Sequence, residues 1–279
     1  MRNFLALVLL VACCSLQAAE TPVTIEPGWG GKSIEGKLML PKTRDLPRRV
    51  VLLLHGFQGQ MDEVGNLYAD LAEQLAEQRI ASLRINFSGE GERNDYVAES
   101  TFESRVGEAE AALNFLKTRY PGAAFGVVGF SLGGLTTMGL MGRHPEAFQS
   151  VVLWSAAQEM RMTGNESYDK AVRDAVKNGR ASYQDWTDIT LTREFVNGFV
   201  GVNTARFLKQ YHGALLTIRG DRDFLPTHDP AWLKLSPSND KSFLMIGGAD
   251  HIFNVLEDPQ PNYPARVLVE TSRWFVRTL

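Results

Sequence analysis

A serine flanked by glycines is the best-placed nucleophile in this chain. The run Gly129-Phe130-Ser131-Leu132-Gly133 puts a glycine two positions before and two positions after Ser131. A serine at a sharp strand-to-helix turn adopts a strained backbone, and such a turn leaves little room for neighbouring side chains. The spacing therefore predicts a hydroxyl lifted above a sheet, next to the N-terminus of a helix.

A histidine late in the chain is the expected general base for that serine. His251 follows the apolar run Ser242–Ile246 through the loop 247–250, which is where a base should lie above a sheet. His55 directly follows another apolar run and suits a structural role. The remaining histidines, which lack a clear position after a strand, are His144, His212 and His228.

The acid that orients this base should follow the preceding strand, Leu215–Gly220. Asp221 and Asp223 both do so, and we favour Asp223 because Asp221 is closer to the strand and to Arg222. An acid in this place fixes the tautomer of the imidazole and stabilises the imidazolium. Asp250 is adjacent to His251 in sequence, and we expect it to brace the loop instead.

A second glycine-containing turn indicates where an oxyanion could be bound. His55-Gly56-Phe57 directly follows the apolar run Val50–Leu54. An oxyanion hole needs two backbone N–H groups aimed at the developing negative oxygen. We expect one from Leu132, directly after the nucleophile, and one from Phe57, with Gly56 allowing close approach.

The elements that must position these residues alternate along the chain. Amphipathic spacing predicts helices over 62–79, from about 102 to 116 behind a capping box of Ser100 and Glu103, over 132–144 and over 267–276. Strands and helices in alternation predict an α/β fold with a doubly wound, mostly parallel sheet. The expected strands are Val23–Ile25, Ile34–Leu40, Val50–Leu54, Ile80–Phe87, Phe125–Phe130, Val151–Ser155, Leu215–Gly220 and Ser242–Ile246.

The alternation breaks between about residues 157 and 213. This stretch is polar and aromatic, and we expect a small helical cap inserted late in the sheet, over the carboxyl ends of the strands. Its aromatic side chains could contact a substrate or form a small core of the cap. They are Tyr168, Tyr183, Trp186, Phe195, Phe199 and Phe207.

Residues 1–19 have the pattern of an export signal, leaving 20–279 as the functional domain. The apolar run Phe4–Val11 follows a single early charge, Arg2, and small residues precede Glu20. The alternative is a buried N-terminal helix. We expect a periplasmic or secreted protein.

Both cysteines of the chain, Cys13 and Cys14, lie in this leader. Cleavage after Ala18 or Ala19 would remove them and leave no disulfide framework. Leu10-Val11-Ala12-Cys13 also resembles a bacterial lipoprotein box, in which an acylated Cys13 would anchor the protein to a membrane. Lipid anchoring through Cys13 is therefore the alternative to simple cleavage.

Composition excludes several other classes of function. The 279 residues carry a formal net charge of −3 without a cluster of Lys and Arg, which argues against a nucleic-acid surface or a polybasic membrane patch. No His-x-x-x-His pair or tight carboxylate cluster appears, so we expect no metal and no cofactor. The glycine-rich segment 88–92 is not a phosphate loop, because its two acids would repel phosphate. Nothing in the sequence predicts the oligomeric state.

Five segments in order resemble the α/β-hydrolases, and most closely the bacterial cinnamoyl (feruloyl) esterases and serine-aminopeptidase-like hydrolases. The resemblance implies Ser131 as nucleophile, Asp223 as acid and His251 as base, with oxyanion amides from Phe57 and Leu132. The segments are HGF at 55–57, IASLRINFSGEGE at 80–92, GFSLGG at 129–134, GDRDFLP at 220–226 and GADHIF at 248–253.

The resemblance also concerns the substrate. In those esterases an insertion after the sixth strand forms a cap that shapes the acyl pocket, and 183–188 is similar in placement. Trp186 and Phe57 are the side chains that this likeness implies in substrate binding. One segment departs from the family: 86–91 has Asn-Phe-Ser-Gly-Glu-Gly where relatives often carry Asp-x-x-Gly-His-Gly. Substrate preference therefore does not transfer directly.

The sequence as a whole predicts a serine esterase acting on a small acyl or aryl ester through an acyl-enzyme. An aminopeptidase, a thioesterase or a lipase of the same fold are the alternatives within the enzyme class. A peptidase should offer acids in the cap for a substrate ammonium, and candidates are present. An envelope binding protein without activity is the alternative of another class. The candidate acids are Glu159, Glu166, Asp169, Asp174 and Glu194.

Overall fold

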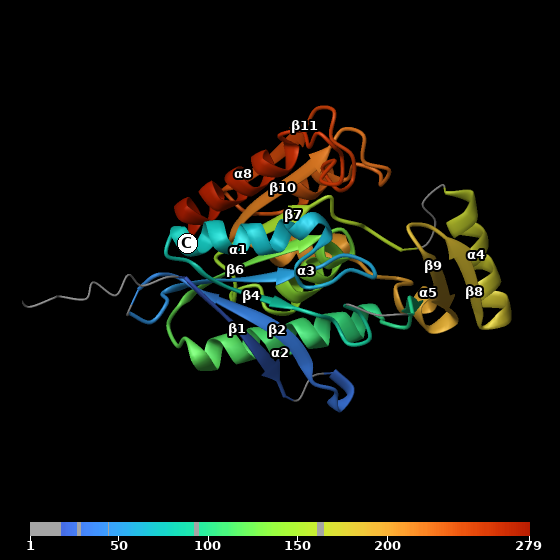
Figure 1. Ribbon diagram of the computed structural model, residues 1–279, viewed down its shortest axis with the longest axis horizontal. Helices are drawn as coiled ribbons and strands as arrows, with labels where there is room; N and C mark the ends of the chain where they lie inside the picture. The colour runs from blue at the N-terminus through green and yellow to red at the C-terminus, as the bar shows by residue number, and fades with distance from the viewer. Residues whose placement is uncertain (1–17, 27–28, 44, 92–94, 161–164) are drawn as a thin grey trace, which may run out of the picture.

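A sheet of eight strands divides the protein into two layers of helices (Figure 1). The computed structural model describes residues 18–26, 29–43, 45–91, 95–160 and 165–279. The strand order is β1-β2-β4-β3-β6-β7-β10-β11. The pairs β1–β2 and β2–β4 are antiparallel, and every pair from β4 to β11 is parallel. The strands are β1 Ala19–Ile25, β2 Ile34–Leu40, β3 Arg49–Leu54, β4 Ala81–Ile85, β6 Ala124–Phe130, β7 Ser150–Trp154, β10 Ala214–Gly220 and β11 Lys241–Ile246.

The central strands are buried on both faces, as their continuous apolar runs predict. In β3, Leu52 and Leu54 belong to the core that includes residues of α2 and α3, whereas Val51 and Leu53 belong to the core that includes residues of α1 and α8. The helices beside the sheet are α1 Leu67–Glu77, α2 Phe102–Arg119, α3 Leu132–Arg143, α7 Asp229–Leu235 and α8 Tyr263–Thr278.

One predicted helix start and one predicted capping box were wrong. The helix expected from residue 62 begins at Leu67, because Glu63 and Asn66 have φ values of 60° and 62°, which interrupt regular α-helix. The capping box of α2 is formed by Thr101 and Ser104, one residue later than expected. The hydroxyl of Ser100 donates instead to the carboxylate of Glu90. The spacing of residues around Ser100 does not indicate this partner, because Glu90 lies on another segment.

The segment between β7 and β10 contains a hairpin as well as helices, so the expectation of a helical cap was only partly right. Its hairpin joins β5 (Val97–Ala98) in a separate sheet of three strands, with the order β5-β9-β8. Alternating burial in β9, where Ile189 and Leu191 point inward, is typical of a strand packed on one face. The elements are α4 Glu166–Asn178, β8 Arg180–Gln184, β9 Asp188–Thr192, α5 Arg193–Gly198 and α6 Thr204–Gln210.

We call α4, β8, β9 and α5 the cap; they stand together at one end of the molecule (Figure 1). The cap has a small aromatic core, in which Tyr168 meets Tyr183 edge-on and Phe195 lies against Phe199. The strand β5, which lies between β4 and α2 in the chain, is bound to the cap, and the hydroxyl of Thr192 donates to the carbonyl of Ala98.

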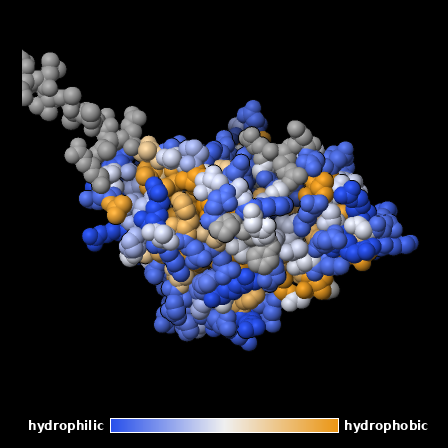
Figure 2. All heavy atoms as spheres, turned by 90° about the horizontal axis from the view of Figure 1, so that it is seen from below, coloured by the Kyte–Doolittle hydropathy of each residue, from blue (hydrophilic) through white to orange (hydrophobic). Residues whose placement is uncertain are grey.

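The predicted export signal lies almost entirely outside the described residues. Ala19 begins β1, and its neighbour Glu20 forms an ion pair with the buried Arg84. None of the described helices is both long and apolar enough to cross a membrane. Figure 2 shows one face of the molecule, on which hydrophilic residues predominate and hydrophobic residues occur in separate patches.

Candidate active site

Ser131 lies at the turn between β6 and α3. Its backbone has φ 52° and ψ −116°, a conformation that residues other than glycine rarely adopt. A Cβ added to Gly129 would lie 2.4 Å from the carbonyl oxygen of Gly133, and one added to Gly133 would lie 2.0 Å from that of Leu54. The flanking positions therefore have no room for a side chain. This is the physical reason for the glycine spacing around Ser131.

The three residues predicted from the sequence as nucleophile, base and acid are hydrogen-bonded in series. The Nε2 atom of His251 is 3.0 Å from Oγ of Ser131, and its Nδ1 atom is 2.8 Å from Oδ1 of Asp223. An ionised carboxylate only accepts hydrogen bonds, so Nδ1 carries the proton and Nε2 is free to accept the serine proton. The arrangement can transfer a proton from Ser131 to His251.

The carboxylate of Asp223 is almost fully buried and has further donors. Arg219 Nη1 donates to Oδ2 at 2.6 Å, and the amide of Leu225 donates to Oδ1 at 2.9 Å. Burial alone would raise the pKa of Asp223, but its contacts with His251 and Arg219 outweigh burial and lower that pKa below the ordinary value. Asp223 is therefore held in its charged form beside the imidazole.

The other two aspartates near the base have structural contacts. Asp221 is exposed and accepts a hydrogen bond from the amide of Gly248 at 2.7 Å. Asp250 accepts from the amides of Ile252 and Asn254, which closes the loop around His251. Neither aspartate has a hydrogen bond to His251 among the described residues.

The loop after β3 lies against the serine, as an oxyanion site requires. A Cβ added to Gly56 would lie 3.4 Å from Cβ of Ser131. In the part of the chain that the structure describes, no hydrogen bond occupies the amides of Phe57 or Leu132. Both amides are therefore available to a ligand oxygen.

His55 is buried and structural. Its Nε2 atom accepts from the amide of Phe87 at 3.1 Å, so Nδ1 carries the proton and donates to the carbonyl of Gly56 at 2.9 Å. Burial lowers the pKa of His55 to about 4. The ring is therefore neutral at physiological pH and serves as a fixed bridge between two loops.

The two side chains expected to bind substrate lie in different surroundings. The ring of Phe57 packs against Phe195 of the cap, with centroids 5.1 Å apart. Trp186 is 57% exposed on the turn between β8 and β9 and meets Tyr96 edge-on. No contact of the described residues joins Trp186 to Ser131 or His251.

Sequence reasoning missed a third aromatic residue at the site. Phe224 follows Asp223, is 62% exposed, and its ring centroid lies 4.5 Å from that of His251. Phe130 packs against His251 at 5.1 Å. The position of an aromatic residue directly after the predicted acid was the signal that could have identified Phe224.

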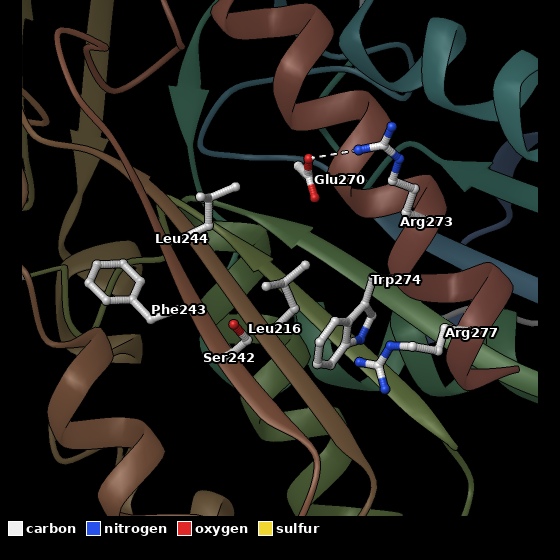
Figure 3. A pocket seen from close by; sticks show the side chains of 8 residues that line it. All are labelled: Leu216, Ser242, Phe243, Leu244, Glu270, Arg273, Trp274 and Arg277. Atoms are coloured by element: carbon white, nitrogen blue, oxygen red, sulfur yellow. Dashed lines mark hydrogen bonds and ion pairs between the residues drawn. The ribbon is translucent and has the colours of Figure 1, made fainter.

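A shallow hollow in the surface lies away from these residues, between α8 and the edge strand β11 (Figure 3). Its lining includes Leu244 of the strand and Trp274 of the helix, whereas His251 follows the end of that strand. Ser131, Asp223 and His251 therefore do not line this hollow. Within the described ranges, no three His, Cys, Asp or Glu side chains gather as a metal site would require.

Solved structures with the same fold cover nearly the whole chain. Est1E from Butyrivibrio proteoclasticus with bound ferulic acid has 17% identity over 92% of this chain and 98% of its own, with a TM-score of 0.73. The esterase domain of a Rhodothermus marinus protein has 20% identity, coverage of 93% and 98%, and a TM-score of 0.66. A dienelactone hydrolase from Anabaena variabilis has 16% identity, coverage of 94% and 99%, and a TM-score of 0.60. At these identities the likeness shows the α/β-hydrolase fold and no more.

The sequence itself identifies the family. A search of curated proteins finds no match. Residues 45–188, more than half of the 279, match the family described as "Serine aminopeptidase, S33". This match and the fold agree with the resemblance of the five sequence segments. The chain belongs to the serine aminopeptidase S33 family of α/β-hydrolases.

Proposed function

We propose that the protein hydrolyses carboxylic esters through an acyl-enzyme formed on Ser131. The observation that carries this proposal is the hydrogen-bonded series from Ser131 through His251 to the buried Asp223. A histidine base and a buried acid in this arrangement make a serine hydroxyl nucleophilic at neutral pH.

In the first half of the reaction, Oγ of Ser131 attacks the ester carbonyl while Nε2 of His251 takes its proton. The oxygen of the tetrahedral intermediate gains a negative charge, to which the amides of Phe57 and Leu132 donate. The imidazolium then gives its proton to the departing alcohol oxygen as the carbon–oxygen bond breaks. Water, deprotonated by His251, attacks the acyl-enzyme in the second half and restores Ser131.

The surroundings favour a small apolar acyl or aryl ester, such as a cinnamoyl-like ester, as the substrate. Phe57 carries one oxyanion amide and has its ring against the cap, so an apolar acyl group would meet aromatic surface there. Phe224 beside His251 offers a second aromatic surface where the alcohol leaves. Est1E, which has the same fold, was solved with ferulic acid, a compound of this type.

An aminopeptidase or a thioesterase is the alternative, and the family description favours the first. A peptidase of this type needs an acid that binds the substrate ammonium. None of the described cap carboxylates is buried, and Asp174 is already paired with Lys170. Buried carboxylates bind a cation far more strongly than exposed ones, so the ester is the better candidate.

The proposal is tested by Ser131→Ala together with a substrate panel. The variant should lose hydrolysis of p-nitrophenyl acetate and labelling by a fluorophosphonate while keeping the circular dichroism spectrum of the parent. Ser167→Ala, at an exposed position of α4, is the matched control and should keep both. Undiminished turnover by Ser131→Ala would overturn the mechanism.

The panel compares hydroxycinnamate esters, acyl-thioesters and aminoacyl-anilides at matched concentrations. A kcat/KM highest for the hydroxycinnamates supports the proposed substrate. A kcat/KM highest for aminoacyl-anilides would replace the ester by a peptide substrate, and one highest for acyl-thioesters would make the protein a thioesterase. The three outcomes share the same triad and differ only in what the cap accepts.

Export is a proposal that rests on residues 1–19 alone. Mass spectrometry of the protein from its native host tests it. A mature chain beginning at Ala19 or Glu20 is expected, and an acylated Cys13 would show lipid anchoring instead. An intact leader on the mature protein would contradict export.

A further inference from the structure

Two loops beside Ser131 are joined by hydrogen bonds along their length. We call residues 55–61 the oxyanion loop and 86–91 the supporting loop. The amide of Phe87 donates to His55, and the amide of Gln58 donates to Glu90. The amide of Met61 donates to the side chain of Asn86. The supporting loop is the segment that departs from the family pattern, and Glu90 occupies the place of its usual histidine.

A buried arginine from α2 lies between the two loops. Arg105 is fully buried; its Nη1 donates to Oε1 of Glu90 at 2.5 Å, and its Nη2 donates to the carbonyls of His55 at 2.7 Å and Gly56 at 3.3 Å. The guanidinium also lies 3.8 Å over the ring of Phe87. These contacts fix the guanidinium in one orientation, with its fork directed at the oxyanion loop.

The carbonyl of Gly56 and the N–H of Phe57 belong to the same peptide group. In a trans peptide the two bonds point in opposite directions. Arg105 and His55 both donate to this carbonyl, so it points toward the buried arginine. The N–H of Phe57 must then point to the opposite side, and Gly56 is the residue that lies against Ser131.

Glycine makes this peptide easy to rotate, because it lacks the side chain that restricts the backbone. A rotated peptide would turn the carbonyl of Gly56 toward the site and the N–H of Phe57 away from it. Glu63 restrains the other side of the glycine, since its Oε2 accepts from the amide of Gly56 at 2.8 Å. The carbonyl of the Gly56–Phe57 peptide is therefore held by Arg105 and His55, and the N–H of the preceding His55–Gly56 peptide is held by Glu63.

We propose that Arg105, oriented by Glu90, is a positioning residue that keeps the N–H of Phe57 aimed at the oxyanion. The inference rests on the proposed function, because it needs Ser131 to form a tetrahedral adduct. It adds that Glu90, which stands where relatives often carry a histidine, supports the oxyanion site through Arg105. Neither side chain touches the substrate.

The test compares Glu90→Gln and the double variant Arg105→Gln/Glu90→Gln with the parent. The double variant removes both charges, which avoids leaving one unpaired buried charge that could prevent folding. Loss of a complete oxyanion donor costs about 10²–10³ in kcat, and we expect misalignment to lower kcat by about 10- to 100-fold with KM nearly unchanged. Glu90→Gln keeps Arg105, and the carbonyls of His55 and Gly56 still accept from its guanidinium, so this variant should show the smaller loss of kcat. Its free energy of unfolding is measured as well, because the buried guanidinium loses its carboxylate partner.

Inhibitor binding separates positioning from general damage to the fold. A trifluoromethyl ketone forms an oxyanion adduct with a serine, whereas the matching methyl ketone occupies the site as a ground-state carbonyl. The ratio of their affinities should fall in parallel with kcat in both variants. Leu116→Ala, buried on the same helix but far from the loops, is the control for lost stability and should leave the ratio unchanged.

The outcomes distinguish the two proposals. A parent protein that hydrolyses no ester and forms no adduct overturns the proposed function. A parent that does both, with double-variant kcat within about twofold of the parent and an unchanged affinity ratio, overturns the positioning role alone. A ratio that falls equally in Leu116→Ala would also overturn it, because the effect would then follow stability rather than the direction of one amide.

Discussion

We call the loops that follow the carboxyl ends of β3, β6, β10 and β11 the floor of the site. The floor and the cap are built in different ways. In the floor, Ser131, Asp223 and His251 follow the ends of parallel strands, and their partners include the fully buried Arg219. In the cap, the ion pair Lys170–Asp174 is exposed, and the aromatic side chains extend the core on one face of the sheet. Buried, hydrogen-bonded charges hold geometry closely, whereas exposed pairs contribute little. We therefore expect variants in the floor to change the rate of every substrate and variants in the cap to change substrate preference.

The strongest test of the floor is Asp223→Asn. An amide leaves the imidazole in the wrong tautomer, so kcat should fall by about 10⁴-fold with the fold intact. Asp221→Asn is the matched control on the same loop; it should stay within about threefold of the parent, because its exposed side chain accepts from the amide of Gly248 and has no hydrogen bond to His251 among the described residues. Steady-state rates with a p-nitrophenyl ester measure both, and the reverse ranking would move the acid to Asp221.

Stability as a function of pH should also distinguish the two regions. Burial raises the pKa of Glu63 to about 7 in the floor, only partly offset by donors such as the amide of Gly56. The folded protein therefore binds more protons than the unfolded chain between about pH 4.5 and 7, so this group makes stability fall as pH rises. Glu63→Gln should remove about 3 kcal/mol of that fall.

Urea unfolding at several pH values measures this change as the difference between variant and parent. Glu166→Gln, at an exposed position of the cap, is the control and should give a curve parallel to that of the parent. A parallel curve for Glu63→Gln as well would show that folding does not raise the pKa of this carboxyl, against the expectation.

A smaller effect on kcat/KM is expected from a change at Phe224, which lies where the leaving alcohol should pass. Phe224→Ala should lower kcat/KM for phenyl esters by about 10-fold and leave methyl esters of the same acid unchanged, because only an aromatic alcohol can pack on this ring. Deacylation of the shared acyl-enzyme, followed by single-turnover kinetics, should be unaffected. Val276→Ala is the control at another exposed apolar position. Equal losses on both esters would exclude a leaving-group contact.

The smallest effect is expected in the cap, from Trp186→Ala. A half-exposed ring contributes little to folding, so the free energy of unfolding should change by less than about 0.5 kcal/mol. Acetyl esters should be hydrolysed at the parental rate, while the KM of hydroxycinnamoyl esters should rise about threefold if the ring contacts a large acyl group. An unchanged KM for the larger esters would remove Trp186 from the substrate site.

Much of the floor could be predicted because its signals are local. The run Val50–Leu54 indicates a buried strand, and the glycines around Ser131 indicate a tight turn into a helix. Asp223 and His251 each follow a predicted strand, and parallel strands bring their carboxyl ends to one edge. The structure brings these residues together, while their catalytic roles await the variants above.

The cap was predicted less well because its signals are mixed. In its hairpin, β9 pairs with β5, a strand of two residues about 90 positions earlier that has no recognisable pattern of its own. The aromatic residues of this stretch are equally consistent with a core and with a pocket. Most of them proved to be core, with Trp186 as the exposed exception.

The sequence by itself determined the family, the order of the elements and the candidate nucleophile, base and acid, since each depends on spacing within a few residues or on position after a strand. Only the tertiary structure decided the support of the oxyanion loop. Arg105 is separated by 15 residues from Glu90 and by 49 from Gly56, and such pairs leave no periodicity along the chain. Burial gives these charges their strength, and burial is a property of the folded molecule.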